Sequence, residues 1–196
     1  MKILLVSDEE SKFIWDFFDK EKFRDIELII SCGDLKKAYL DFLVSMIPAP
    51  LYYVPGNHDK SFVSNPPEGC TCLHGKVVTY KGIRFFGLGG CLSPRKDTYE
   101  YTEEEMKKLI RKARWPLWKS GGYDILVTHA PAAGIGEGQD LFHRGFQCFV
   151  TLNDRYKPAY HFFGHQHKRY GRTMPERFQR GGTTYLNACG YQILEI

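Results

Sequence analysis

The chain has 196 residues, a length that suits one domain with a sizeable core and is short for two. Its hydrophobic fraction of 43% and charged fraction of 26% are typical of a soluble globular protein, and a net charge of +4 is too small to indicate nucleic-acid binding. No apolar run approaches the roughly 20 residues that cross a bilayer, and the run after Lys2 is too short for a signal-peptide core. We expect one cytosolic domain over residues 1–196, without a membrane partner.

Elements follow one another in a regular order along the chain. Apolar, β-branched or aromatic runs bounded by Gly, Pro, Asn or Asp predict strands at residues 2–7, 26–31, 50–54, 76–80, 83–87, 124–128, 160–163, 183–188 and 191–195. Helical spacing of apolar residues predicts helices at residues 11–20, 36–46, 102 to about 116, and 146–155. Thr102 and Glu105 have the spacing of a capping box, which places the start of the third of these helices.

The order of these elements predicts the topology. Strand, helix and strand alternate in the first half, which indicates parallel βαβ pairing. Two hairpins are expected later, residues 77–80 with 83–86 turned at Lys81-Gly82, and residues 185–188 with 192–194 turned at Gly190. No internal repeat or linker interrupts the chain, so we expect one mixed domain with more than one sheet.

The six cysteines do not form an obvious disulfide framework. Cys32, Cys91 and Cys189 fall in or beside apolar runs, where a free thiol behaves as a small hydrophobic group. The Cys70-Thr71-Cys72 segment could supply half of a zinc site, but no second half follows with suitable spacing. We expect reduced, structural cysteines.

Polar side chains with metal-binding chemistry follow several of the predicted strands. They are Asp8, Asp34, the run Asn57-His58-Asp59, His129, and His165 with His167. In open α/β sheets, ligands bind just beyond the carboxyl ends of the strands, so these residues should meet in one cleft. Asp and Asn are also common turn formers, but His is not, which makes a chance arrangement a poor explanation.

The chemistry of this set suits divalent metal ions. Carboxylate and amide oxygens combined with imidazole nitrogens fit Mn²⁺, Fe²⁺, Zn²⁺ or Co²⁺. The set has more donors than one ion needs, and two ions that share a carboxylate about 3.5–4 Å apart can clamp an in-line displacement at phosphorus. Glycines before Asp34, Asn57 and His165 allow tight turns that aim these side chains over the sheet edge.

In these motifs the sequence resembles the calcineurin-like metallophosphoesterase superfamily. The family pattern is D-x-H, GD, GNH followed by D or E, a lone H, and GHxH, each after a strand. Here it reads Asp8-Glu9-Glu10, Gly33-Asp34, Gly56-Asn57-His58-Asp59, His129 and Gly164-His165-Gln166-His167, so that the match runs from residue 3 to residue 167. The resemblance implies an α/β fold of the four-layer α-β-β-α type, with two mixed sheets and the metal site at the C-terminal strand ends. It also suggests a closing hairpin over residues 183–194.

The resemblance further implies a role for each residue. Asp8 and His167 are expected to bind a first metal ion, and Asp34 to bridge to a second. The second ion is expected to be held by Asn57, His129 and His165. Two divalent ions are implied, with Mn²⁺ expected and Fe, Zn, Ni, Co or Mg as alternatives, and a metal-bound hydroxide as nucleophile.

Two neighbouring residues in the GNHD motif have other expected roles. The resemblance implies that His58 is not a ligand and acts as proton donor to the leaving group. Asp59 could orient His58, an expectation that rests only on their adjacency.

Glu10 is the main departure from the pattern, because the family has His at this position. Glu10 could still bind the first metal ion, giving a more anionic site that favours Mn²⁺ or Mg²⁺. It could instead point away and leave that ion weakly held. We favour ligation, because Glu is long enough to reach a cationic site.

Several other residues have two readings. Asp140, His143 and Arg144 could border the substrate cleft, or one of the first two could cap a helix. The basic residues of segment 168–172, with Arg177 and Arg180, could steer an anionic substrate or simply form a solvated loop. His74 and His161 are expected to be structural, and Trp115 and Trp118 to lie in the core.

The predicted function is hydrolysis of a phosphomonoester or phosphodiester. The compact chain favours a small phosphorylated substrate, such as a nucleotide or metabolite, and its layout resembles the small class-III-type phosphodiesterases more than the protein phosphatases. The alternative is a binding or scaffold protein that keeps the fold with a weakened site. The oligomeric state is left open.

Overall fold

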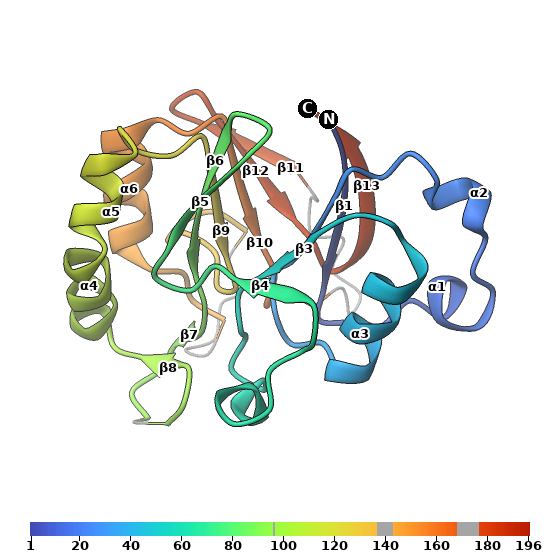
Figure 1. Cartoon of the computed structure of the whole chain (residues 1–196). Helices are drawn as coiled ribbons and strands as arrows, with labels where there is room; N and C mark the ends of the chain where they lie inside the picture. Colours follow the sequence, from blue (N-terminus) through green and yellow to red (C-terminus); the bar gives the residue numbers. More distant parts are fainter. Residues whose placement is uncertain (96, 137–142, 168–176) are drawn as a thin grey trace.

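The computed structural model describes residues 1–95, 97–136, 143–167 and 177–196. Two large sheets face each other in the middle of the molecule, with α1 to α3 outside one and α4 to α6 outside the other (Figure 1). This is the α-β-β-α arrangement that the resemblance implied. No helix among the described residues has the length and apolar character needed to cross a membrane.

Each sheet is mixed, with parallel strands inside. The first has the order β13-β1-β2-β3-β4, where the strands span Gly190–Glu195, Lys2–Ser7, Leu28–Ser31, Leu51–Tyr53 and Cys70–Cys72. The second has the order β11-β12-β10-β9-β6-β5, where the strands span Arg177–Arg180, Thr183–Asn187, Tyr160–Phe163, Ile125–Thr128, Ile83–Leu88 and Val77–Tyr80. The edge strands β13, β11 and β5 are antiparallel to their neighbours, whereas the edge strand β4 is parallel to β3. A short pair, β7 (Cys91–Leu92) and β8 (Glu100–Tyr101), lies apart from both.

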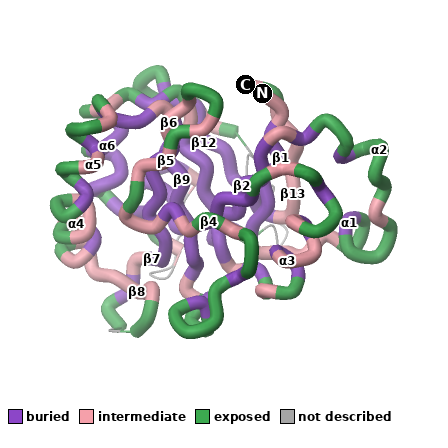
Figure 2. Tube along the Cα trace, viewed as in Figure 1, coloured by how far each residue is buried: buried purple, intermediate pink, exposed green. Residues whose placement is uncertain are grey.

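Alternation along β1 explains why this sheet is covered on both faces. Ile3 and Leu5 belong to the cluster that also holds Phe85 and Phe162 of the second sheet. Leu4 and Val6 belong to the cluster formed with α1 to α3. Successive side chains of a strand point to opposite faces, so an uninterrupted apolar strand requires a layer on each side. The buried trace accordingly runs through the centre of the molecule (Figure 2).

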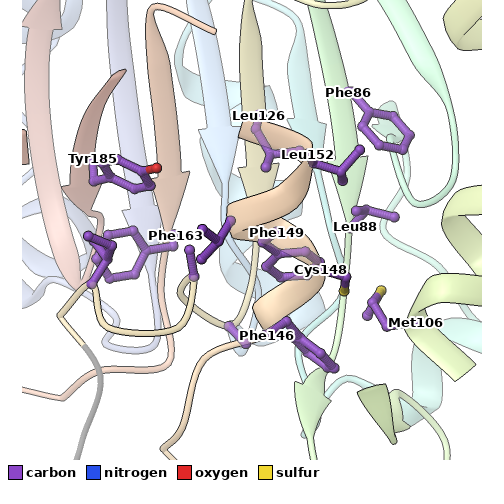
Figure 3. Packing of buried hydrophobic residues seen from close by; sticks show 14 of the residues in the cluster. Phe86, Leu88, Met106, Leu126, Phe146, Cys148, Phe149, Leu152, Phe163 and Tyr185 are labelled. Atoms are coloured by element: carbon purple, nitrogen blue, oxygen red, sulfur yellow. The ribbon is translucent and has the colours of Figure 1, made fainter. Parts of the chain in front are cut away.

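The helices cover the outer faces of the two sheets. They span Lys12–Asp16 (α1), Lys20–Phe23 (α2), Lys37–Met46 (α3), Glu103–Lys112 (α4), Arg114–Lys119 (α5) and Gln147–Tyr156 (α6), with a 3₁₀ turn at Lys60–Val63. Phe146, Phe149 and Leu152 of α6 pack on the second sheet, beside Leu126 and Phe163 (Figure 3). The helix expected at residues 11–20 ends early: α1 stops at Asp16, and α2 begins only at Lys20.

The capping box at Thr102 is confirmed, but the helix it opens ends before the expected position. The Thr102 hydroxyl accepts from Glu105 N–H, and the Glu105 carboxylate accepts from Thr102 N–H. Helix α4 ends at Lys112, and α5 continues through Pro116. Proline is tolerated there because it lies in the first turn of α5, where its missing N–H has no intrahelical partner.

Trp115 and Trp118 are not in the core, contrary to expectation. Their side chains are 65% and 72% exposed, and their rings stack on each other at 5.0 Å between centroids. Ala113 and Leu117 provide the buried face of this segment. On a short helix, residues three apart share a face, and here that face is turned away from the sheet.

The hairpin expected at the end of the sequence is wrong. β12 pairs in parallel with β10 and antiparallel with β11, whereas β13 pairs antiparallel with β1 in the other sheet. The chain therefore crosses between the sheets at Ala188 and Cys189. β12 and β13 each pair with a strand that is distant in the sequence, β10 and β1, so they do not pair with each other. The hairpin of β5 and β6 is confirmed.

Candidate metal centre

The predicted site residues meet at the carboxyl ends of the strands. Asp8 follows β1, Asp34 follows β2, His129 follows β9 and His165 follows β10. Asp8, Asp34 and His165 adopt positive φ angles of 62°, 57° and 65°. Such conformations are strained for residues other than glycine and cluster at functional sites. They turn these side chains back over the sheet edge directly after each strand.

His129 is the centre of the cluster. Its Nδ1 lies 2.7 Å from the Cys32 carbonyl, so Nδ1 is the donor and Nε2 carries the lone pair in the neutral ring. Around Nε2 lie Asn57 Oδ1 at 3.0 Å, His165 Nδ1 at 3.1 Å and Asp34 Oδ2 at 3.3 Å. Asp34 Oδ2 is buried and has no hydrogen-bond partner among the described residues. Several lone pairs therefore converge on one point.

The electrostatics favour a positive charge at this point. Burial lowers the pKa of His129, but the charges of Asp34 and Asp8 outweigh it and raise that pKa to about 9. Burial likewise opposes ionisation of Asp34, yet His129 and the His58 N–H hold the pKa of this carboxyl well below its usual range. A divalent cation would meet the same demand, since its ligands are acceptor atoms such as those gathered here. This group of ligand atoms therefore fits a metal ion.

Two glycines permit the close approach of the loops that carry these side chains. Gly33 has a φ of 96°, and a Cβ there would lie 2.5 Å from Gly56 N. A Cβ on Gly56 would lie 2.1 Å from Asp34 Oδ1 and 2.7 Å from the His129 ring. Any larger residue would displace the proposed ligands, which is why both loops need glycine.

The other part of the site is formed by Asp8 and His167. Both carboxylate oxygens of Asp8 accept from the His165 N–H, at 3.0 and 2.9 Å, and burial raises the pKa of this carboxyl. His167 Nε2 lies 3.9 Å from Asp8 Oδ1. The structure thus brings together the two residues expected at the first metal position.

His58 lies at the rim of the site, and Asp59 lies below it. The His58 side chain is 78% exposed, with Nε2 3.9 Å from Asp34 Oδ2. The Asp59 carboxylate is buried and accepts from the backbone N–H groups of Asp34 and Gly56, both at 2.8 Å. These contacts indicate that Asp59 ties the two ligand-bearing loops together, a different role from the orientation of His58 expected from adjacency.

Glu9 and Glu10 have different neighbours. The Glu10 carboxylate lies 3.5 Å from Lys36 Nζ. Glu9 has a carboxylate oxygen within 4.8 Å of ligand atoms of His167 and Cys189. Ligation by Glu10 stays a prediction, and sequence reasoning missed the nearness of Glu9 and Cys189 to the site.

The comparison with known families matches this geometry. The family model described as calcineurin-like phosphoesterase matches residues 1–169. The chain belongs to the calcineurin-like phosphoesterase family. It is 32% identical over 122 residues to UPF0046 protein T07D4.2 of Caenorhabditis elegans, covering 60% of this chain and 28% of that protein. It is 29% identical over 158 residues to human metallophosphoesterase domain-containing protein 1, covering 76% and 45%. The chain thus spans less than half the length of these two relatives.

A solved structure with the same fold is the phosphopantetheinyl hydrolase PptH of Mycobacterium tuberculosis. The TM-score is 0.61, with 13% sequence identity, over 96% of this chain and 88% of that one. At this identity the likeness concerns the fold alone. The layers and sheets described above are therefore those of a metallophosphoesterase fold.

His143 borders the cluster, as one of its two readings expected. Its ring centroid is 5.1 Å from that of His165 and 6.4 Å from that of His167. The N-cap of α6 is Phe146, and Glu103 accepts from the N–H groups of residues 147 and 148, so His143 is not the cap. Arg144 is exposed, as are Arg177 and Arg180 on β11. Asp140 and segment 168–172 lie outside the described residues.

His74 and His161 are structural, as expected. His74 Nδ1 accepts from Gly89 N–H. His161 is fully buried, with Nδ1 2.9 Å from Asn153 Nδ2 and Nε2 2.8 Å from Thr128 Oγ1. The Asn153 amide is a donor, so Nε2–H of the neutral ring donates to Thr128. This network fixes the strand β10 that leads to His165.

The buried His161 should make stability depend on pH. Burial lowers its pKa to about 3 in the folded chain, whereas the unfolded value is about 6.5. Between pH about 3 and about 6.5, His161 binds a proton in the unfolded state but not in the folded state. The free energy of unfolding should therefore fall as pH falls below about 6.5, by up to about 1.4 kcal/mol per pH unit. Urea unfolding of the chain and of His161→Gln at several pH values measures this. Parallel curves for both proteins would contradict it.

Proposed function

We propose that the chain hydrolyses a small phosphomonoester or phosphodiester at a two-metal centre. The observation that carries this is the convergence of Asn57, His165 and Asp34 acceptor atoms within 3.3 Å of His129 Nε2. The buried Asp34 Oδ2, which has no hydrogen-bond partner among the residues described, supports the same conclusion. A cation bound there would satisfy this oxygen.

Each residue has a role in this proposal. Asp8 and His167 would hold the first ion, and Asp34 would be shared by the first and second ions. Asn57, His129 and His165 hold the second. When bound, two divalent ions supply Lewis-acid charge to the phosphoryl group and lower the pKa of the attacking water. Mn²⁺ and Zn²⁺ are the ions to test first in activity assays.

His58 is placed to handle the leaving group. Its exposed ring at the rim can meet substrate, while its backbone N–H donates to Asp34 Oδ1 at 2.8 Å. The same carboxylate thus ties His58 to the metal position. We assign His58 the transfer of a proton to the departing oxygen.

A cavity beside His58 fits a small anionic substrate. It has a volume of about 300 Å³ and includes Lys36, Lys37 and Phe62 in its lining. Lys36 is 81% exposed and pairs with Glu10 at 3.5 Å, so a substrate phosphate would compete with this carboxylate for its charge. This size favours a nucleotide or phosphorylated metabolite over a phosphoprotein.

Metal removal and return provide the direct test. Protein stripped with a chelator should not hydrolyse p-nitrophenyl phosphate or bis-p-nitrophenyl phosphate. Adding Mn²⁺ or Zn²⁺, alone or together, should restore turnover, and the ratio of the two rates gives the monoester or diester preference. The absence of turnover with Mn²⁺, Zn²⁺, Co²⁺, Ni²⁺, Fe²⁺ and Mg²⁺ would favour the scaffold alternative.

A further inference from the structure

Three side chains form a ligand cluster beside the first metal position. Glu9, His167 and Cys189 each place a ligand atom within 4.8 Å of the others. Glu9 follows β1, His167 follows β10 and Cys189 follows β12, so three separate strand ends meet here. His167 Nε2 is also 3.9 Å from Asp8 Oδ1. The cluster therefore adjoins the Asp8 carboxylate and is continuous with the proposed centre.

We propose that Glu9 and Cys189 complete the first metal position in this chain, in place of Glu10, and make it a site for Zn²⁺. The inference rests on the proposed function in one respect, the assignment of Asp8 and His167 to that position. A carboxylate, an imidazole and a thiolate are ligands that zinc accepts together. Thiolates disfavour Mn²⁺ and Mg²⁺, which prefer oxygen ligands.

The turn after β1 selects Glu9 over Glu10. Asp8 has a φ of 62°, and Glu9 N–H donates to the Ser7 carbonyl at 2.6 Å, which closes a tight three-residue turn. The chain reverses within this turn, and the Glu9 carboxylate comes near His167. The Glu10 carboxylate is instead 3.5 Å from the ammonium group of Lys36 and is 26% exposed. The Glu10 carboxylate, which stands where the family has His, is thus already paired with Lys36.

Cys189 is held in place by the loop that carries His167. Its backbone N–H donates to Asn187 Oδ1 at 3.1 Å, and Asn187 Nδ2 donates to the Gln166 carbonyl at 3.0 Å. Cys189 also forms a bridge with Ser7, the residue before Asp8. It is 1% exposed, and a buried thiol becomes a thiolate only when a cation stabilises it. The Asn187 side chain therefore links the backbone at Cys189 to the backbone of the residue before His167.

X-ray absorption of the zinc-loaded protein tests this directly. The wild-type spectrum should contain a sulfur ligand at about 2.3 Å in addition to nitrogen and oxygen at about 2.0–2.2 Å. The Co²⁺-loaded protein should show a thiolate-to-cobalt charge-transfer band in the near ultraviolet. Both signals should disappear in Cys189→Ser and persist in the control Cys148→Ser, whose cysteine lies on α6. Glu9→Gln should lose about half of the bound zinc, while Glu10→Gln should keep it.

Several outcomes would overturn the inference. They are a wild-type spectrum without sulfur, a sulfur signal that persists in folded Cys189→Ser, and zinc loss in Glu10→Gln with none in Glu9→Gln. Circular dichroism checks folding, and if Cys189→Ser does not fold, the wild-type spectrum and the two glutamate variants decide. Phosphoesterase turnover without a sulfur ligand would remove this inference alone. A sulfur ligand without turnover would remove the proposed function alone.

Discussion

Asp34→Asn is expected to reduce phosphoesterase turnover by about 10³-fold or more, because the stabilisation that a metal ion gives to the transition state is worth several kcal/mol. The variant keeps the shape of the side chain and the Oδ1 acceptor for His58 N–H. It removes the negative charge. It also replaces Oδ2, the acceptor atom 3.3 Å from His129 Nε2 in the wild type, with an amide NH₂ group. Metal content per chain should fall, and so should the rise in melting temperature on adding Mn²⁺.

Asp25→Asn is the matched control for this prediction. Asp25 is 64% exposed and pairs with Arg24 on the surface, so its loss should leave metal content and turnover unchanged. Asp34→Asn protein that binds two ions and turns over normally would show that this carboxylate does not bridge them.

His58→Ala is expected to lower kcat by about 10²- to 10⁴-fold, the range for loss of a positioned general acid. Metal content should stay at the wild-type level, because no acceptor atom of His58 lies in the cluster around His129. The loss should depend on the leaving group. An alkyl phosphate needs a proton on the departing oxygen, whereas p-nitrophenolate departs without one, so the alkyl substrate should lose more.

Val63→Ala serves as the control, since Val63 is 68% exposed in the neighbouring 3₁₀ turn. Equal losses for the two substrates would contradict proton transfer by His58. A fall in metal content would instead make His58 a residue that positions Asp34.

Sequence predicted which polar residues come together at the strand ends better than it predicted the edges of the fold. The strands that lead to Asp8, Asp34 and His129 are long apolar runs, and a residue directly after such a strand has a nearly fixed place at the sheet edge. The short edge strands β4 and β11 carry exposed or half-buried residues and have no such signal. Their pairing comes from neighbouring strands and not from their own pattern.

The details that sequence could not supply depend on single backbone angles or on distant packing. Whether Glu9 or Glu10 faces the cluster is decided by the turn at Asp8, which no periodicity reveals. Trp115 and Trp118 look like core residues by composition, and only the orientation of α5 exposes them. Only two residues separate β12 from β13 in the chain, yet β13 joins the other sheet, where it pairs with β1.

The pairing of β1 with β13 bears on how the chain is made. Lys2 lies opposite Glu195 and Ser7 opposite Gly190, so β1, which is synthesised well before β13, has an unpaired outer edge until β13 emerges. Until then, β1 presents free backbone donors and acceptors that could add a strand from another molecule. The pairing also joins residues that are far apart in the sequence, such as Ser7 and Gly190, which slows folding. We expect this edge to be where nascent chains associate with one another or with chaperones.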